Sequence, residues 1–178
     1  MEIFKETLAV VILAATLLML CTAMISLFLA VPYVPSKKRV VQKMIQVAGL
    51  RKNEVVYDLG CGDGRLLFEA EKNKKIQAKG YELAPIPYLL ALTRKFMANS
   101  KTNIRMSNFF NANLRDANVI FCYLGPETMV KLYEKIKKEC KKGTRIISNT
   151  FSIHGVKPAK VWAQNPKEKL PSIYLYEI

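Results

Sequence analysis

The sequence predicts an α/β fold in which a parallel sheet carries helices on both faces and follows one apolar helix. Three observations support this class. Strand and helix candidates alternate along residues 37–178, as they do in parallel sheets. A glycine-rich loop directly follows the first apolar strand, where open α/β sheets bind their ligands. The segment before the domain contains a long run without any charged residue.

The uncharged run extends for 24 residues from Leu8 to Val31. A helix needs about 20 apolar residues to cross a bilayer. The alternatives are a cleaved signal peptide, whose apolar core is usually about 7–15 residues, and a buried helix, which would be shorter or have a polar face. We therefore expect residues 1–31 to form a transmembrane anchor and residues 32–178 to form one domain.

Basic residues flank this run unequally. Lys37, Lys38, Arg39 and Lys43 follow it, whereas only Lys5 precedes it. Basic residues near a membrane span stay on the cytoplasmic side. The sequence therefore predicts a single-pass protein of the cell membrane with its domain in the cytoplasm.

The expected helices alternate with the expected strands along the domain. Ser36 is the expected N-cap of the first domain helix, which Gly49 would end. The helices are expected at residues 37–48, 65–72, 85–98 and 127–140, and the strands at 54–58, 77–82, 103–107, 117–123, 144–149, 160–163 and 172–178.

Apolar periodicity predicts which faces of two helices are buried. In the first domain helix these residues are Val40, Met44, Val47 and Ala48. In the helix at 127–140 they are Met129, Val130, Tyr133, Ile136 and Cys140.

The glycine loop departs from a dinucleotide-binding fingerprint. Glycines recur at every second position from Gly60 to Gly64, but Arg65 stands where the G-x-G-x-x-G pattern has its third glycine. Asp58 and Asp63 in the same loop would repel a pyrophosphate and attract a sulfonium cofactor that carries a free amino group. The loop therefore predicts S-adenosylmethionine as the cofactor, the alternative being a glycine turn without a ligand.

A second acid supports a nucleoside-bearing cofactor. Glu82 ends the strand at 77–82 and follows Gly64 by 18 residues. An acid at about this distance from the glycine loop can accept hydrogen bonds from a ribose. An exposed carboxylate at a strand end is the alternative for Glu82 alone.

Five segments carry a family resemblance. In order, they are Pro32-Tyr33-Val34-Pro35-Ser36, residues 58–65, Gly80-Tyr81-Glu82-Leu83, Tyr123-Leu124-Gly125-Pro126-Glu127 and Gly143-Thr144-Arg145-Ile146-Ile147-Ser148. Together they resemble the class I, seven-strand S-adenosylmethionine-dependent methyltransferases. Within that class they resemble the small membrane-anchored prokaryotic relatives of mitochondrial protein-lysine methyltransferases and, more distantly, Dot1-type enzymes. The similarity covers roughly Tyr33 to Ile178 and implies a Rossmann-like sheet, mostly parallel, with the last strand antiparallel.

The resemblance also implies the residues of the cofactor site. Asp58 and the loop backbone would hold the amino acid end, Glu82 the ribose, and Asn108 with Phe109 the adenine. Many relatives have an aspartate where Asn108 stands. The segment with Tyr33 and Ser36 would close over the cofactor, although Ser36 as a helix cap alone is the alternative. The full expected set is Tyr33, Ser36, Asp58, Gly60, Cys61, Gly62, Asp63, Gly64, Glu82, Asn108 and Phe109.

Methyl transfer to an amine requires positioning and a neutral nucleophile. A lysine has an unperturbed pKa near 10.4, so the site must help to deprotonate or desolvate it. The resemblance implies that Tyr123 lines the acceptor channel, that Glu127 attracts the lysine and that Asn149 orients it. Relatives often have histidine where Asn149 stands, and packing alone is the alternative for Tyr123.

Charge and cysteine content constrain the partners. The chain has 28 Lys and Arg residues against 14 Asp and Glu residues, for a formal net charge of +14. This balance favours an anionic surface, and the expected anchor favours the cytoplasmic leaflet of the membrane over nucleic acid. The four cysteines have no metal-ligand spacing, so we expect reduced thiols and no metal site.

The function expected from these features is protein-lysine N-methylation of a membrane-associated protein by a membrane-anchored enzyme. A lipid or small-molecule methyltransferase is one alternative. A cofactor-binding module without catalysis is another, motivated by the departures at Asn108 and Asn149.

Overall fold

The computed structural model describes residues 2–29, 33–73 and 75–178, with side chains described except at 25–29 and 73. The helices are α1 Glu2–Leu29, α2 Lys38–Ala48, α3 Arg65–Asn73, α4 Pro85–Met97 and α5 Pro126–Glu139, with a 3₁₀ turn at Phe109–Asn111. The strands are β1 Val55–Leu59, β2 Gln77–Glu82, β3 Asn103–Met106, β4 Val119–Cys122, β5 Arg145–Asn149, β6 Lys160–Trp162 and β7 Ile173–Glu177. The helices and strands expected within the domain are all present, with ends that differ by at most two residues.

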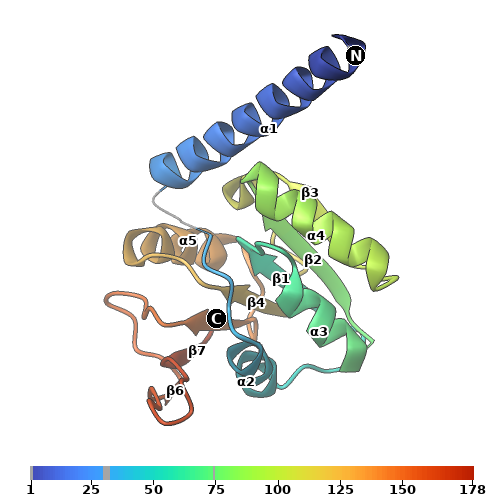
Figure 1. Cartoon of the computed structure of the whole chain (residues 1–178). Coiled ribbons are helices and arrows are strands. Elements are labelled where there is room, and N and C mark those ends of the chain that lie inside the picture. Colours follow the sequence, from blue (N-terminus) through green and yellow to red (C-terminus); the bar gives the residue numbers. More distant parts are fainter. Residues whose placement is uncertain (1, 30–32, 74) are drawn as a thin grey trace.

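The strands form a seven-stranded sheet in the order β3-β2-β1-β4-β5-β7-β6 (Figure 1). Strands β1 to β5 all run parallel to one another. The last strand, β7, lies between β5 and β6 and runs antiparallel to both. This is the Rossmann-like sheet with an antiparallel last strand that the sequence predicted.

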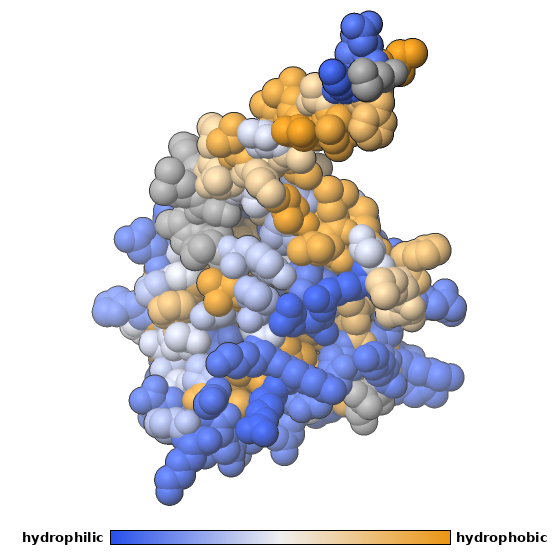
Figure 2. Space-filling view, in the orientation of Figure 1, coloured by the Kyte–Doolittle hydropathy of each residue, from blue (hydrophilic) through white to orange (hydrophobic). Residues whose placement is uncertain are grey.

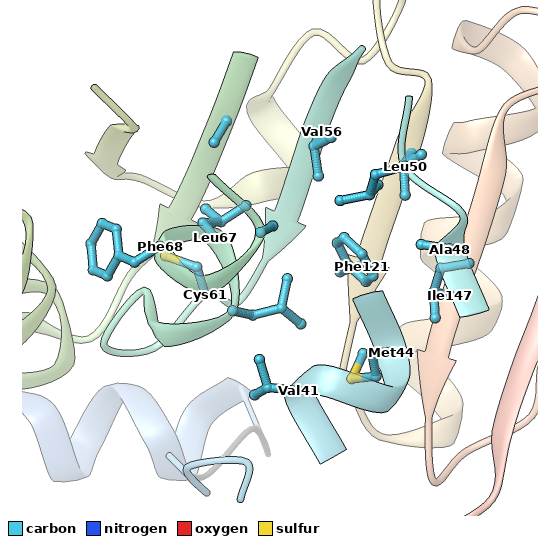
Figure 3. Packing of buried hydrophobic residues seen from close by; sticks show 14 of the residues in the cluster. Val41, Met44, Ala48, Leu50, Val56, Cys61, Leu67, Phe68, Phe121 and Ile147 are labelled. Carbon is cyan, nitrogen blue, oxygen red and sulfur yellow. The ribbon is translucent and has the colours of Figure 1, made fainter. Parts of the chain in front are cut away.

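Alternating side chains of the strands build a core on each face of the sheet. On one face Val56, Phe121 and Ile147 belong to a cluster with residues of α2, α3 and α4. In Figure 3, Val41 and Met44 of α2 point toward this side of the sheet. On the other face, Tyr57, Ile120 and Ile146 pack in a cluster that includes the buried side of α5. Helices therefore cover both faces, as expected.

The start of α2 corrects the expectation for Ser36. The N-cap is Lys37, in an extended conformation and without a side-chain capping bond. The helix begins one residue later than expected, which removes Ser36 from the cap position. The expectation for the other end is confirmed, because Gly49 caps the helix with φ 55°.

One expected core position was wrong, and the expected positions Val47, Tyr133 and Cys140 are only partly buried against the core. In α2, Val41 is buried whereas Val47 is only half-buried. In α5, Val130 is 38% exposed, and the buried stripe runs through Met129, Leu132 and Ile136. A stripe at i, i+3 and i+7 leaves the residue next to Met129 rotated by about 100° toward solvent.

Helix α1 is long and apolar enough to cross a membrane, judged by its length and composition over Glu2–Met24. It contacts the rest of the chain at the beginning of α4, where the Ile86 N–H donates to the Thr22 hydroxyl at 3.3 Å. The expected boundary between residues 31 and 32 lies outside the described residues.

Candidate functional site

A pocket of about 450 Å³ lies at the carboxyl ends of β1, β2 and β4. Segments far apart in the sequence line it, among them residues 33–36, the glycine loop, the end of β2, the turn after β3 and the chain that follows β4. Of the residues expected in the cofactor site, the pocket lining includes Tyr33, Ser36, Asp58, Gly60, Cys61, Gly62, Asp63, Glu82, Asn108 and Phe109. Gly64 is not part of this lining.

The glycine loop uses its backbone N–H groups within the protein. The Gly60 and Cys61 N–H groups both donate to the Tyr81 carbonyl, at 2.9 and 3.0 Å. The Gly62 N–H donates to Glu82 Oε2 at 2.8 Å. A phosphate site needs free N–H donors, so the loop is poorly suited to a pyrophosphate. The acids around it suit a cationic ligand instead.

Two glycines have different roles in this loop. Gly62 has φ +56°, and a Cβ there would lie 2.8 Å from the Tyr33 ring. Its lack of a side chain therefore lets the segment before the domain close over the loop. Gly64 serves packing instead, because a Cβ there would meet the Phe68 ring at 2.7 Å.

Arg65 fastens the segment at 33–36 to the loop. Its Nε donates to Asp63 Oδ1 at 2.9 Å, and its Nη1 donates to the Ser36 carbonyl at 2.7 Å. Arg94 adds a second ion pair to Asp63 at 3.0 Å. Burial would raise the pKa of Asp63, but hydrogen bonds from Arg65 and the charges of both arginines hold it below its usual value. Asp63 is therefore an anion that organises the loop.

Asp58 has the opposite electrostatic setting. It is 7% exposed at the wall of the pocket. Burial, followed by the negative charges of Glu82 and Asp63, raises the pKa of Asp58 to about 8. A cation that binds next to this carboxyl would favour its ionised form. The amino group of S-adenosylmethionine is such a cation.

Glu82 joins the two halves of the site. Its Oε2 accepts from the Gly62 N–H, and its Oε1 accepts from the N–H groups of Leu83 and Ala84 at 2.9 and 2.8 Å. An ionised carboxylate offers about four acceptor positions, so capacity remains for a ribose hydroxyl. These bonds fix the carboxylate in one orientation before any ligand arrives.

The turn after β3 forms another side of the pocket. Asn108 Oδ1 accepts from the Phe110 N–H at 2.9 Å and caps the 3₁₀ turn. This bond leaves the amide NH₂ of Asn108 free to donate to a ring nitrogen. The rings of Phe109 and Phe110 lie 4.7 Å apart, and both line the pocket. Sequence reasoning missed Phe110, although it adjoins the expected pair.

The pocket continues past the end of β4. Tyr123 stacks on Phe151, with ring centroids 6.1 Å apart and planes 22° apart. Thr128 and Lys131 of α5 also line this side. Sequence reasoning missed Phe151, which lies 28 residues after Tyr123 and carries no motif of its own.

The structure does not bring the other two expected acceptor-site residues into the pocket lining. Glu127 lies in the first turn of α5 and is exposed. Asn149 is 2% exposed at the end of β5, where its Oδ1 accepts from the Thr150 hydroxyl at 3.1 Å. Among the residues expected to act on the acceptor, Tyr123 alone lines the described pocket.

The fold and this pocket together define a class I S-adenosylmethionine-dependent methyltransferase. The residues fit S-adenosylmethionine, because the loop is poorly suited to a phosphate and the acids around it favour the cofactor's positively charged amino group. Comparison with known proteins gives the family. The ANTKMT methyltransferase domain matches residues 58–160, more than half of the chain, and the chain belongs to this family.

Curated relatives and solved structures agree with this assignment. A protein-lysine N-methyltransferase of Saccharolobus islandicus is 35% identical over 151 residues, 83% of this chain and 94% of that protein. The adenine nucleotide translocase lysine N-methyltransferase of Mus musculus is 28% identical, over 84% of this chain and 69% of that protein. A Salinibacter ruber RNA methyltransferase in complex with S-adenosyl-L-homocysteine superposes with a TM-score of 0.76 at 27% identity, covering 82% of this chain and 94% of that chain.

Proposed function

We propose that this chain is a membrane-anchored protein-lysine N-methyltransferase that modifies a membrane-associated protein. One observation carries the lysine assignment: the 35% identity to a protein-lysine N-methyltransferase, which extends over nearly the whole of that relative. The mouse relative is also a lysine methyltransferase, and its name gives a translocase as its substrate.

The geometry beside the cofactor pocket supports an amine acceptor. The stacked rings of Tyr123 and Phe151 form an aromatic wall. Removal of a lysine ammonium from water lowers its pKa, which favours the neutral nucleophile. Aromatic faces also attract an ammonium group, including a methylated one. The Tyr123 hydroxyl can accept from the entering amine and orient it.

When bound, S-adenosylmethionine supplies the electrophilic methyl group. The chain's own residues position the two partners. Asp58 binds the cofactor's amino group, and Glu82 binds the ribose. Arg65 holds the segment with Tyr33 over the loop, which excludes water from that side of the pocket.

Helix α1 supports the membrane part of the proposal. Its described side chains through Met24 are almost entirely exposed, and they form an apolar surface of sufficient length to cross a bilayer. The strongly basic domain that follows suits an anionic leaflet. A protein substrate in the same membrane would meet the pocket without diffusing through the cytoplasm.

The test uses the full chain in phosphatidylglycerol-containing vesicles with membrane proteins and methyl-labelled S-adenosylmethionine. We expect label in methyllysine after acid hydrolysis, and much less label with the Glu82→Ala variant at a limiting cofactor concentration. Label removed by organic solvent would instead indicate a lipid or small-molecule acceptor. Label removed by ribonuclease would indicate RNA, which the net charge and the Salinibacter relative make the natural competitor. Cofactor binding without label in any fraction would indicate a non-catalytic module.

A further inference from the structure

Helix α4 has an apolar face that the described part of the chain leaves uncovered. Leu89, Leu90, Phe96 and Met97 are 47%, 43%, 88% and 79% exposed. Their spacing places them on neighbouring positions of one side of the helix. The opposite side packs through Pro87 and Ala91. An exposed apolar face of this kind usually marks a surface that meets a partner or a membrane.

This face continues the apolar surface of α1. The two helices are in contact, and the Ile86 N–H at the start of α4 donates to Thr22 of α1. Figure 1 shows α4 beginning beside the end of α1 nearer the domain and running away from α1 at an oblique angle. In Figure 2 the apolar colour extends from α1 onto the adjoining edge of the domain, whereas the lower part of this view is hydrophilic.

The level of the contact matches a membrane interface. The uncharged part of α1 begins at Leu8, and at 1.5 Å per residue the helix rises about 21 Å from there to Thr22, within the roughly 30 Å of a hydrocarbon core. If Leu8 lies at one interface, Thr22 and the start of α4 lie about 9 Å short of the other, on its hydrocarbon side. An amphipathic helix that begins at this level lies in the boundary between headgroups and acyl chains.

The charges around α4 complement an anionic leaflet. Residues 83–115 contain no Asp or Glu, and they include Arg94, Lys95, Lys101, Arg105 and Arg115. An amphipathic helix with basic flanks binds membranes by inserting its apolar side about 5–10 Å into the headgroup and acyl boundary. Basic residues near the surface add electrostatic attraction.

We propose that the apolar face of α4 inserts into the interface of an anionic membrane beside α1 and docks the domain there. This inference rests on the anchoring proposed above and adds a second, surface-lying contact to it. Two points of attachment would fix the orientation of the domain, which one helix alone does not. Leu83 and Ala84, just before α4, line the cofactor pocket. Docking would therefore hold the pocket close to the headgroups and select lysines at that level.

The experiment measures contact between α4 and lipid directly. Trp162 is replaced by Phe in the full chain, and a single tryptophan is introduced as Phe96→Trp. The protein is reconstituted into phosphatidylglycerol vesicles that contain lipids brominated near the headgroup. Val130→Trp in the same background is the matched control, because Val130 is exposed on α5 across the sheet. We expect bromolipid to quench Phe96→Trp several-fold more than Val130→Trp.

Three other outcomes would overturn the inference. Washing the vesicles with alkaline carbonate removes proteins that lack a transmembrane anchor. Release of the protein by this wash would therefore refute both proposals about the membrane. If the protein resists the carbonate wash but bromolipid quenches Phe96→Trp no more than Val130→Trp, the anchor is present and α4 does not dock on the membrane. Unquenched fluorescence that shifts to the blue as protein concentration rises would identify a second copy as the occupant of this face. The methyllysine assay is independent of all three.

Discussion

Asp58 should make cofactor binding depend on pH. Its pKa is raised to about 8, first by burial and then by Glu82 and Asp63, so the carboxyl of the free enzyme is largely protonated at neutral pH. The cofactor's amino group, with an ordinary pKa of about 7.7–8.0, stays cationic below pH 7. Binding that needs ionised Asp58 should therefore tighten about tenfold from pH 6 to pH 7, or about 1.4 kcal/mol.

Isothermal titration of the full chain in detergent with S-adenosylhomocysteine measures this dependence. Repeating the titration in buffers of different ionisation enthalpy should also show release of most of one proton per ligand at pH 6. The matched control, Asp58→Asn, should bind more weakly and with no slope over this interval. A flat profile for the unaltered chain, or a slope that persists in Asp58→Asn, would refute the assignment.

The same carboxyl predicts a stability difference. A pKa raised in the folded state means that the protonated group's contribution to stability is present below the unfolded-state value of about 3.9 and is lost as pH rises toward 8. Asparagine stays neutral throughout. The Tm of Asp58→Asn, relative to the unaltered chain, should therefore rise from pH 5 to pH 8. An unchanged difference would argue against the buried, shifted carboxyl.

Three further substitutions test the rest of the site. Glu82→Ala leaves three N–H groups without their acceptor and removes the ribose contact. Hydrogen bonds to a charged group contribute about 1.5–3 kcal/mol, so the cofactor Kd should rise by at least tenfold. An unchanged Kd in calorimetry would show that Glu82 does not bind the cofactor. Tyr123→Phe keeps the ring on Phe151 but loses the hydroxyl, so kcat should fall about tenfold while the cofactor KM holds; an unchanged kcat would leave Tyr123 a packing role. Arg65→Ala removes the hydrogen bond to the Ser36 carbonyl. The free energy of unfolding, measured in urea, should fall by about 1.5–3 kcal/mol, and the cofactor KM should rise. An unchanged free energy of unfolding would mean that Arg65 does not fasten this segment.

Local sequence patterns predicted most of the fold. Strand and helix segments were visible because apolar runs and periodic faces lie within single stretches of chain. The antiparallel position of β7 came only from the family resemblance, since the order of strands depends on contacts between distant segments. The start of α2 was missed because Ser36 is a good capping residue by type, whereas Arg65, 29 positions later, holds its carbonyl elsewhere.

The residues of the candidate site were also only partly predictable from the sequence. Asp58 and Glu82 were predictable because each lies at the carboxyl end of an expected strand beside the glycine loop. Arg65 was seen in the sequence only as a missing glycine, and its role as a bridge became visible once residues 33–36 lay across the loop. Phe151 could not be found, because it approaches Tyr123 only through the packing that follows β5. Glu127 belongs to a motif of the family but faces solvent, whereas Thr128 and Lys131 of the same helix line the pocket.

Mass spectrometry of the methylated product tests the central claim most directly. Membrane proteins are incubated with vesicle-bound full chain and S-adenosylmethionine that carries a deuterated methyl group, in parallel with Glu82→Ala. The account predicts deuterated methyl groups on lysine side chains of membrane-associated proteins, and far fewer of them with the variant at a limiting cofactor concentration. Deuterium found only in RNA or lipid, or on lysines equally with both proteins, would contradict it.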